Sequence, residues 1–520
     1  MLSTIRDVLP MIQTLIDSNG VESTWHALLR ARVTQSGEIF SYILTQPELH
    51  DTHIILEDIL FGLSIGEISV LYEYSLAYNN RKKRKDEGQY FTPDDVARFM
   101  ANHARTFPNT AVWIDPCSGV GNLSYWLIRE QADPEQFLLT QLYLVDRDPI
   151  ALLIARVLFT LYFQRDDKHL FIKIADRFLE RDFLKTHDLP ICDVAILNPP
   201  YVSGVLDENF ATANARNTYA YFLEKVATLC SKGYIAITPQ TFTNGQRFSP
   251  LREMLINCHS ALDVYCFDNV PDNIFSGFKF GSDNTNKANS TRAAILVARN
   301  AQEKCHRITP LLRWRSHERA AMFAAAPSFL TATPFTNALF PKITKELAPL
   351  YAMATSFQKT LGSIVASGKT PYALYVPSTP RYFISANKAQ VARTSSKTLY
   401  FNSSGDRDYA YIVLNSSYMY WWWRVCDGGM TITEKTLLEL PIPDDGAMLN
   451  RRLVANLEQS EKTSKVVKLN AGKVIENIKH SPELVHSLTM SLFPQYANHL
   501  RATHSNSHMS NAAQQMRLAY

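Results

Sequence analysis

The sequence lacks the patterns that would place the chain in a membrane or in an oxidising compartment. Its seven cysteines are scattered, and no two form a Cys-x-x-Cys pair, so neither a zinc site nor a disulfide framework is indicated. No apolar run reaches the length of about 18 residues that favours a membrane span. The residues after Met1 lack the basic-then-apolar pattern of a signal peptide. We therefore expect a cytoplasmic protein without a bound metal.

Neither sign of charge dominates, so the overall charge points to no single class of function. The 520 residues carry 53 Lys and Arg against 49 Asp and Glu, a formal net charge of +4. A mildly basic chain is compatible with nucleic-acid binding but does not require it. The densest charge is the basic run Arg81–Lys85. This run would either bind the phosphates of a nucleic acid or form a solvated linker.

The length and the hydrophobic pattern predict about three domains. We expect an N-terminal helical segment over residues 1–87, a central domain over 88–300, an α+β domain over 301–500 and a disordered polar tail over 501–520. Within the α+β domain, helical spacing with many charges returns at 453–478.

The central domain alternates short apolar runs with helical stretches, which is typical of a doubly wound α/β sheet. Helices are predicted over 149–163 and 219–230. Strands are predicted at 111–114, 142–145, 194–197, 234–237, 262–267 and 293–298. Sheets of this kind bind ligands at the carboxyl ends of their strands, so the polar residues found there are the candidates for a functional site.

The most informative residues are Asn198-Pro199-Pro200-Tyr201, which follow an apolar run. Neither proline can continue a strand ladder, so the chain must leave the sheet at its carboxyl end. The Asn198 side-chain oxygen and the Pro199 carbonyl can accept two hydrogen bonds from one amino group, and the Tyr201 ring offers a flat face. This tetrapeptide predicts a site for a planar molecule with an exocyclic amino group. The alternative is an ordinary turn from strand to loop.

An acid and two glycines follow the first predicted strand. Gly119 and Gly121 permit a tight turn and a close approach of the backbone to a ligand. The third glycine of a dinucleotide fingerprint is missing, and the Asp115 carboxylate would repel a pyrophosphate. That carboxylate suits a ligand with an ammonium group instead.

Two further acids are expected at the tips of strands. Asp146 ends the second strand, where an acid commonly accepts hydrogen bonds from ribose hydroxyls, although it could instead cap the next helix, a role that suits Asp148 better. Asp182 would accept from an adenine amino group with Phe183 against the ring, and Asp176 is its rival because its flanks are similar. Three acids without a phosphate cradle indicate S-adenosylmethionine rather than a nucleotide.

With these residues the chain resembles the amino-methylating DNA methyltransferases, specifically the N6-adenine enzymes of restriction–modification systems. It is similar to the subgroup in which the methionine-binding segment comes first and the target-recognition domain comes last. The segment Gly88–Ala97, which precedes Asp115, carries the first part of this resemblance. The resemblance covers about residues 88–300, with a looser match over 414–443.

The resemblance implies a Rossmann-like methyltransferase sheet and methyl transfer to N6 of an adenine flipped out of duplex DNA. Asn198, Pro199 and Tyr201 would hold the target base. The partner would be duplex DNA, and any cognate restriction endonuclease would be a separate chain, because the roughly 80 leading residues are too few for a nuclease domain. The setting would be a bacterial cytoplasm.

The resemblance also implies which residues surround the cofactor and the base. An aromatic ring would pack on the base opposite Tyr201; Phe275 is preferred, with Phe278 and Phe280 as competitors. The residues expected to bind S-adenosylmethionine are Tyr90, Phe91, Thr92, Pro93, Asp115, Cys117, Gly119, Asp146, Asp182 and Phe183.

The residues that would read DNA are less sharply indicated. Candidates for base and phosphate contacts are Ser367–Tyr372, Arg393–Lys397, Arg407 and Arg424. Trp421–Trp423 would either form an aromatic platform or pack in a core, and a core position is favoured because adjacent bulky aromatics usually bury.

Other functions compete with this interpretation. Cytosine N4 is also an exocyclic amine, so a cytosine-N4 DNA methyltransferase uses the same chemistry. A protein-glutamine methyltransferase could use the same tetrapeptide, but such enzymes are typically shorter, and the residues after 300 would be unexplained. A specificity subunit without catalysis would not need the acids or Asn198.

Overall fold

The computed structural model describes residues 2–50, 52–79, 92–166, 168–204, 209–275, 291–380, 382–393, 395–426, 431–443, 450–470 and 473–509. The chain divides into two compact units. The sheet unit comprises Met1–Pro239 and Arg247–His306, and the C-terminal unit comprises Gln240–Gln246 and Arg307–Tyr520. None of the helices in the described ranges is both long and apolar enough to cross a membrane.

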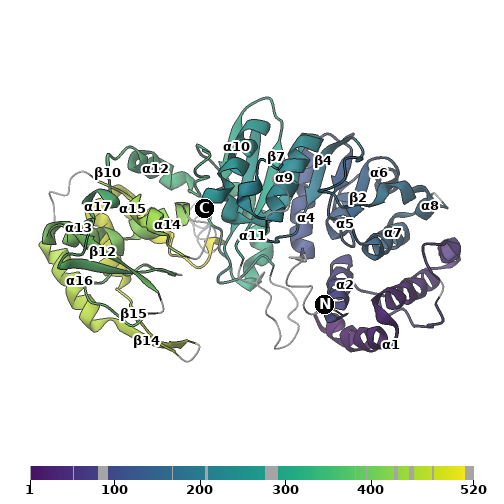
Figure 1. The fold of residues 1–520 in the computed structure, drawn as a ribbon, viewed down its shortest axis with the longest axis horizontal. Helices are drawn as coiled ribbons and strands as arrows, with labels where there is room; N and C mark the ends of the chain where they lie inside the picture. The colour runs from purple at the N-terminus through teal and green to yellow at the C-terminus, as the bar shows by residue number, and fades with distance from the viewer. Residues whose placement is uncertain are drawn as a thin grey trace, which may run out of the picture. The chain divides into compact units, whose positions relative to one another are not determined.

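A twisted sheet forms the centre of the sheet unit (Figure 1). Its strands include β1 (Trp113–Asp115), β2 (Leu142–Asp146), β3 (Phe178–Glu180), β4 (Cys192–Leu197), β5 (Cys230–Pro239), β6 (Ala261–Phe267) and β7 (Ala293–Arg299). The spatial order is β3-β2-β1-β4-β5-β7-β6. Strands β1 to β5 pair in parallel, and β7 runs antiparallel to β5 and β6. The predicted doubly wound α/β sheet is thereby confirmed.

Helices cover this sheet and supply its connections. They are α4 (Asp94–Asn102), α5 (Asn122–Arg129), α6 (Pro134–Thr140), α7 (Pro149–Phe163), α8 (Leu170–Lys173), α9 (Thr218–Leu229) and α10 (Ser249–Cys258). The Asp148 side chain caps α7 by accepting from the backbone N–H groups of Ile150 and Ala151, and Pro149 occupies the first turn. The predicted start of that helix and its cap are confirmed.

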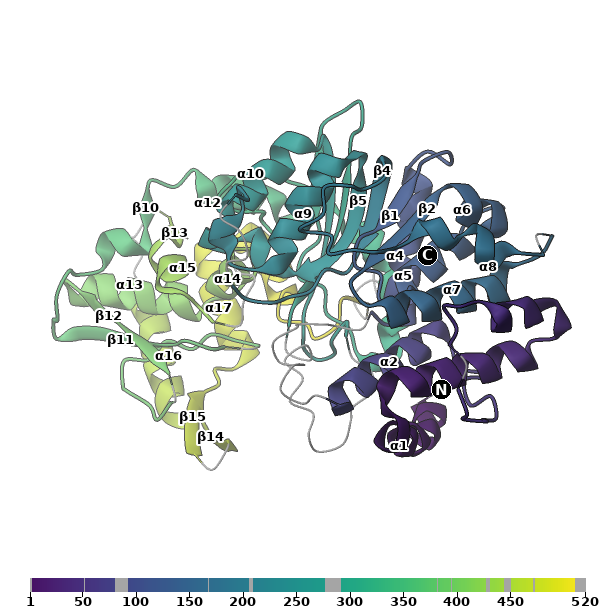
Figure 2. The same ribbon diagram turned by 45° about the vertical axis from the view of Figure 1, so that its right-hand side comes forward.

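The N-terminal helices belong to the same compact unit as the sheet (Figure 2). They are α1 (Leu2–Gln35), which is interrupted at Gly20 with φ 77°, the 3-10 helix η1 (Glu38–Thr45) and α2 (Ile65–Asn79). The Trp25 indole N–H donates to the Ser75 hydroxyl at 3.1 Å, which joins α1 to α2. The Tyr42 hydroxyl donates to the Gln164 side chain at 2.7 Å, just beyond the end of α7. These contacts fix the helical segment against the sheet.

The C-terminal unit is a mixture of helices and short strands, as the α+β prediction requires. Its helices are α11 (Arg319–Ala325), α12 (Ala348–Thr355), α13 (Ser404–Asn415), α14 (Ser417–Cys426), α15 (Glu434–Leu438), α16 (Arg451–Thr463), α17 (Pro482–Leu492) and α18 (Ala497–Ala502). Its strand pairs are β10 (Lys359–Thr360) with β13 (Pro441–Ile442), β11 (Tyr372–Pro377) with β12 (Ser396–Phe401), and β14 (Lys465–Asn470) with β15 (Lys473–Ile478).

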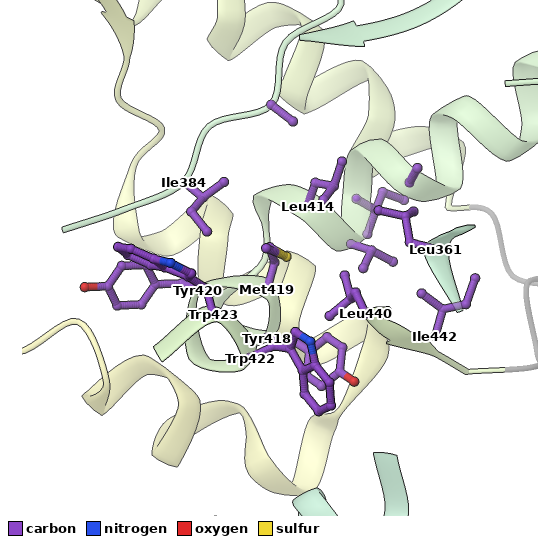
Figure 3. Close-up of a cluster of buried hydrophobic side chains, with 14 of the residues drawn as sticks. Leu361, Ile384, Leu414, Tyr418, Met419, Tyr420, Trp422, Trp423, Leu440 and Ile442 are labelled. Carbon is purple, nitrogen blue, oxygen red and sulfur yellow. The ribbon is translucent and has the colours of Figure 1, made fainter. Parts of the chain in front are cut away.

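Helix α14 carries the aromatic cluster into the core of this unit. Trp421, Trp422 and Trp423 are all buried, and Figure 3 shows Trp422 and Trp423 among the buried side chains of neighbouring elements. The Tyr418 hydroxyl reaches the Pro441 carbonyl at 2.8 Å and ties α14 to β13. The preference for a core role over an exposed aromatic platform is confirmed.

Two segments of the C-terminal unit differ from prediction. The helical spacing over 453–478 ends with α16, and the remainder forms the antiparallel pair β14–β15, in which β-branched residues in both segments favour strands. Residues 501–509, predicted to be disordered, are packed. The His504 ring stacks on Tyr420 with ring centroids 4.3 Å apart, and His508 accepts from the Arg313 backbone N–H at 3.0 Å. Residues 510–520 lie outside the described part of the chain.

Candidate active site

Four polar residues lie at the carboxyl edge of four neighbouring strands. Asp182 follows β3, Asp146 ends β2, Asp115 ends β1, and Asn198 follows β4. The chain runs outward from β1 through β2 to β3 and then returns to place β4 on the other side of β1. The edge between β1 and β4 is therefore the topological switch point, where open α/β sheets bind their ligands.

A cavity of about 910 Å³ opens at this edge. The predicted site residues in its wall are Thr92, Asp115, Cys117, Gly119, Asp146, Asp182, Phe183 and Asn198. Pro93 is the residue before α4. Tyr90 and Phe91, as well as the basic run Arg81–Lys85, lie outside the described residues. A cavity of this size is at the upper end of the range for small-molecule and cofactor sites.

The backbone turn between β1 and α5 fixes the Asp146 carboxylate. The Gly119 N–H donates to one carboxylate oxygen at 2.8 Å, and the Asp148 N–H donates to the other at 3.0 Å. Burial raises the pKa of Asp146, while the bond from Gly119 lowers it in part. The Arg147 N–H also bonds this carboxylate, and the remaining acceptor capacity can receive a hydroxyl group of a bound ligand.

Asp115 is the most deeply buried acid of the site. One of its oxygens accepts from the Ser124 hydroxyl at 2.9 Å. Burial raises its pKa to about 7, and the bond from Ser124 opposes the shift. A carboxyl group of this kind gains most from a cationic partner, because a nearby positive charge favours its ionised form.

The glycine turn needs both of its glycines. Gly119 and Gly121 adopt φ of 51° and 82°, in the left-handed region that side chains disfavour. The Gly121 N–H donates to the Ser118 carbonyl at 2.8 Å, and the Ser118 N–H donates to the Val145 carbonyl at 3.1 Å. The turn is thereby held against the end of β2, and α5 begins immediately after it.

Asn198 is held by hydrogen bonds at both ends of its carboxamide. Its NH2 group donates to the Thr92 hydroxyl at 2.8 Å, and its oxygen accepts from the Tyr201 hydroxyl at 2.8 Å. The same Tyr201 hydroxyl lies 3.1 Å from the Ile237 carbonyl in β5. The Asn122 NH2 group donates to the Thr92 carbonyl at 2.7 Å. Thr92 therefore joins the tetrapeptide to the first residue of α5.

The two rival acids lie at opposite ends of β3. Asp176 precedes the strand, whereas Asp182 follows it and lines the cavity. The Phe183 ring stacks on Phe222 with centroids 5.3 Å apart, and the Lys225 ammonium lies 5.1 Å from the Phe183 ring centroid. Only Asp182 of the two is at the ligand-binding edge, which favours it as the acid nearest an aromatic ligand ring.

The aromatic pair suggested for the target base is in edge contact. The Tyr201 and Phe275 ring centroids are 6.4 Å apart with an interplanar angle of 62°, and both side chains are largely buried. A base cannot enter between rings in this arrangement, so Phe275 would have to turn away to stack on it. Phe278 and Phe280 lie outside the described residues.

Helix α2 contributes a wall of the cavity that the sequence did not predict. Ser69, Tyr72, Glu73 and Leu76 line it. The Tyr72 hydroxyl donates to the Asp148 carboxylate at 2.7 Å, next to Asp146. The apolar spacing of Tyr72 and Leu76 indicates a buried helix face, but it does not reveal that this face meets the sheet edge.

The donors and acceptors of this cavity fit S-adenosylmethionine. Asp146 offers oriented oxygens for ribose hydroxyls, and Asp182 with Phe183 suits an adenine. The Asn122 side-chain oxygen is buried and has no hydrogen-bond partner among the described residues, and Asp115 lies in the same wall. Together they offer an unsatisfied acceptor and a carboxyl group to the ammonium of a methionine moiety.

Comparison with known proteins shows what this region is similar to. Residues 64–282 match the family model described as N-6 DNA Methylase. A comparison with curated proteins returned no match.

Several solved structures are similar to the chain at low identity. A protein from Vibrio vulnificus YJ016, described as a type I modification subunit, is 12% identical with a TM-score of 0.37, over 56% of this chain and 66% of its own. A DrdV–DNA complex is 13% identical with a TM-score of 0.45, over 91% of this chain and 55% of its own. The type IIL restriction–modification enzyme MmeI, solved with DNA, is 11% identical with a TM-score of 0.47, over 88% and 90%.

The family match begins at the N-terminal end of α2 and includes the glycine turn, the strand-tip acids and the Asn-Pro-Pro-Tyr tetrapeptide. Residues 64–282 are therefore similar to the N-6 DNA methylases, and the cofactor of this region is S-adenosylmethionine.

Proposed function

We propose that this chain is a site-specific DNA methyltransferase that methylates N6 of an adenine flipped out of duplex DNA. It would serve as the modification enzyme of a restriction–modification system. The observation that carries the proposal is the position of Asn198 beside Thr92 and Cys117 in the cavity wall. An amide oxygen held at that point can receive an exocyclic amine next to the methyl donor.

Two oxygens of the tetrapeptide would receive the amino group. The Asn198 side-chain oxygen and the Pro199 carbonyl would each accept one N–H of the adenine amine. The lone pair of that nitrogen is delocalised into the ring, and bonding both hydrogens favours a pyramidal nitrogen whose lone pair points out of the ring plane. Positioning and charge stabilisation would supply most of the rate. No general base is required before transfer, because the product ammonium loses its proton readily.

The three acids would hold the cofactor by its separate parts. S-adenosylmethionine supplies an activated methyl group on a sulfonium sulfur. Asp182 would bind the adenine amine, Asp146 the ribose hydroxyls and Asp115 the methionine ammonium, in the order of β3, β2 and β1. Asn198 follows β4, the next strand along the edge. This order would bring the target amine to the methionine end of the cofactor.

The C-terminal unit would contain the target-recognition domain, but two of the predicted DNA contacts are internal. Arg424 is buried in α14, with its guanidinium 5.6 Å from the Trp423 ring centroid. Arg393 donates to the carbonyls of Ser385 and Glu476, both at 3.3 Å. Neither arginine can contact DNA without leaving these partners. Any cognate endonuclease would act as a separate chain on the same DNA sites.

The test is methylation by the full-length protein of duplex DNA carrying many sequences, with labelled S-adenosylmethionine. Nucleosides released from the product are then separated. We expect labelled N6-methyladenine with the wild-type chain and none with Asn198→Ala. Labelled N4-methylcytosine would identify the cytosine enzyme, and label found only in a protein extract would identify a glutamine methyltransferase. Either of those results refutes adenine as the acceptor.

A further inference from the structure

The hydrogen bond between Thr92 and Asn198 crosses from the cofactor side of the cavity to the target side. Thr92 stands two residues before α4 and is 6% exposed. Its hydroxyl is 2.8 Å from the Asn198 amide nitrogen, and its carbonyl accepts from Asn122 at 2.7 Å. One residue thus contacts both the start of α5 and the side chain proposed to bind the base.

The orientation of the Asn198 carboxamide matters because its two ends have opposite hydrogen-bonding character. The oxygen accepts, whereas the NH2 group only donates. The terminal torsion of an asparagine side chain is broad and roughly two-fold, so an unrestrained carboxamide can turn its NH2 group toward an incoming amine. That arrangement places donor against donor and forms no bond.

We infer that Thr92 is a positioning residue for methyl transfer: its hydroxyl holds the Asn198 NH2 group and keeps the amide oxygen available to the target amine. The Tyr201 hydroxyl supports the other end at 2.8 Å. Because the Thr92 carbonyl accepts from Asn122 beside the glycine turn, the residue that supports the acceptor for the base is itself fixed to the cofactor wall. This inference rests on the proposed function.

The test compares Thr92→Val with Thr92→Ser. Valine keeps the shape and the backbone carbonyl but removes the hydroxyl, and serine restores the hydroxyl. With Thr92→Val we expect kcat to fall about 3- to 10-fold at saturating DNA and cofactor, which corresponds to one neutral hydrogen bond. The dissociation constant of S-adenosylmethionine, measured by calorimetry, should change less than 2-fold. Thr92→Ser should retain most of the wild-type kcat.

An unchanged kcat in Thr92→Val would overturn the inference, as would a loss that appears only in cofactor affinity. A wild-type chain that methylates no DNA would refute the proposed function instead. A double variant with Asn198→Asp, which keeps one acceptor oxygen but has no NH2 group, should show no further loss from Thr92→Val. An additive loss would assign Thr92 a role that is independent of Asn198.

A second and independent observation concerns the β14–β15 hairpin. Its register pairs Lys465 with Ile478 and Leu469 with Val474. Val467, Leu469 and Val474 are 59%, 76% and 59% exposed, and they occupy register positions on one face of the ribbon. Figure 2 shows the hairpin extending beyond α16 at one end of the C-terminal unit.

The base of this hairpin is fixed, and its sequence is basic. The Glu476 N–H donates to the Ala392 carbonyl at 2.7 Å, and the Lys479 N–H donates to the Ser464 carbonyl at 3.0 Å. From 462 to 479 the chain has five lysines and one glutamate. That glutamate already pairs with Lys465 at 3.0 Å.

We propose that this hairpin is a DNA-contacting ribbon of the target-recognition domain, and this too rests on the proposed function. A two-stranded ribbon fits the major groove of B-DNA. The lysines would bind phosphates, and the exposed apolar side chains would contact thymine methyl groups. The excess of positive charge favours a polyanionic partner over an apolar protein surface.

The test measures DNA affinity over a range of salt concentrations for Lys465→Ser/Lys479→Ser, two lysines whose side chains are exposed. The control is Lys345→Ser/Lys435→Ser, which removes two lysines of the same unit outside the hairpin. We expect the hairpin variant to bind cognate DNA at least 3-fold more weakly and its salt slope to fall by about 1–2, with cofactor affinity unchanged. The proposal would be overturned if the salt slope of the hairpin variant equalled that of the wild type, or if the control variant lost as much DNA affinity as the hairpin variant. If the wild-type chain binds no DNA, the proposed function fails.

Discussion

Replacing Gly121 by alanine should destabilise the sheet unit much more than the same change at Gly119. A Cβ at Gly121 would lie 2.6 Å from the Phe159 ring carbon Cζ and 3.3 Å from the Ala155 Cβ. The left-handed backbone costs about 1–2 kcal/mol for a residue with a side chain, and forcing a methyl group into a packed site costs about 1–3 kcal/mol more. We therefore expect the free energy of unfolding to fall by about 2–5 kcal/mol.

The matched control is Gly119→Ala, because Gly119 has a φ of 51° and nothing lies within 4 Å of a Cβ placed there. Only the backbone cost of about 1–2 kcal/mol applies to it. That open space belongs to the cavity, however, since Gly119 lines it and Gly121 does not. The added methyl group should therefore weaken cofactor binding at position 119.

The assay is urea denaturation of each cofactor-free variant, followed by calorimetric titration with S-adenosylmethionine under native conditions. Gly121→Ala should lower the free energy of unfolding more than Gly119→Ala does. Gly119→Ala should weaken cofactor binding although its loss of stability is the smaller one. Equal losses of stability in the two variants would refute the argument that Phe159 and Ala155 enforce a glycine at 121. Unchanged affinity in Gly119→Ala would refute the placement of the cofactor against this turn.

Four further predictions concern the acids and the asparagine. The pKa of Asp115 is raised to about 7 in the folded chain, so the folded state holds the proton more tightly than the unfolded state does. The free energy of unfolding should therefore fall as the pH rises from about 4 to about 7. In urea titrations at several pH values, Asp115→Asn should make this dependence on pH weaker. Over pH 6–8 cofactor affinity should rise as Asp115 ionises, and calorimetry in buffers of different ionisation enthalpy should detect proton release that is missing in Asp115→Asn. Asp146→Ala should weaken cofactor binding at least 10-fold, and unchanged affinity would contradict its assignment to the ribose. Asn198→Ala should abolish methylation and leave the cofactor dissociation constant nearly unchanged, so retained turnover would exclude the acceptor role.

The part of the fold that the sequence predicts best is the part that is buried on both sides. Strands β4, β6 and β7 are almost entirely buried, and their runs of apolar residues are visible without any partner. The range of strand β3 was not predicted, although Asp182 was expected at a strand tip, because β3 is a short edge strand of partly exposed residues. The hairpin at 465–478 was mistaken for a helix because its charges obscure the alternation that marks a strand.

The polar residues at strand ends were predictable because chain order places them there. Asp115, Asp146 and Asn198 each end or follow a recognisable strand, and parallel strands bring their carboxyl ends together. The contribution of α2 was not predictable, because periodicity shows that a helix has a buried face but not what covers it. The hydrogen bond between Thr92 and Asn198 joins residues 106 positions apart, and no local sequence pattern predicts such a pair.

The wall of the cofactor cavity extends along the chain from Ser69 in α2 to Thr228 in α9. The ribosome therefore makes one side of the binding site well before the other. At synthesis rates of about 5–20 residues per second, roughly 8–30 s separate the synthesis of Leu76 from that of Thr228. In the first part of that interval the N-terminal helices have no sheet edge to cover, because β1 to β4 are made after them. The complete wall that surrounds S-adenosylmethionine exists only after α9 has been made.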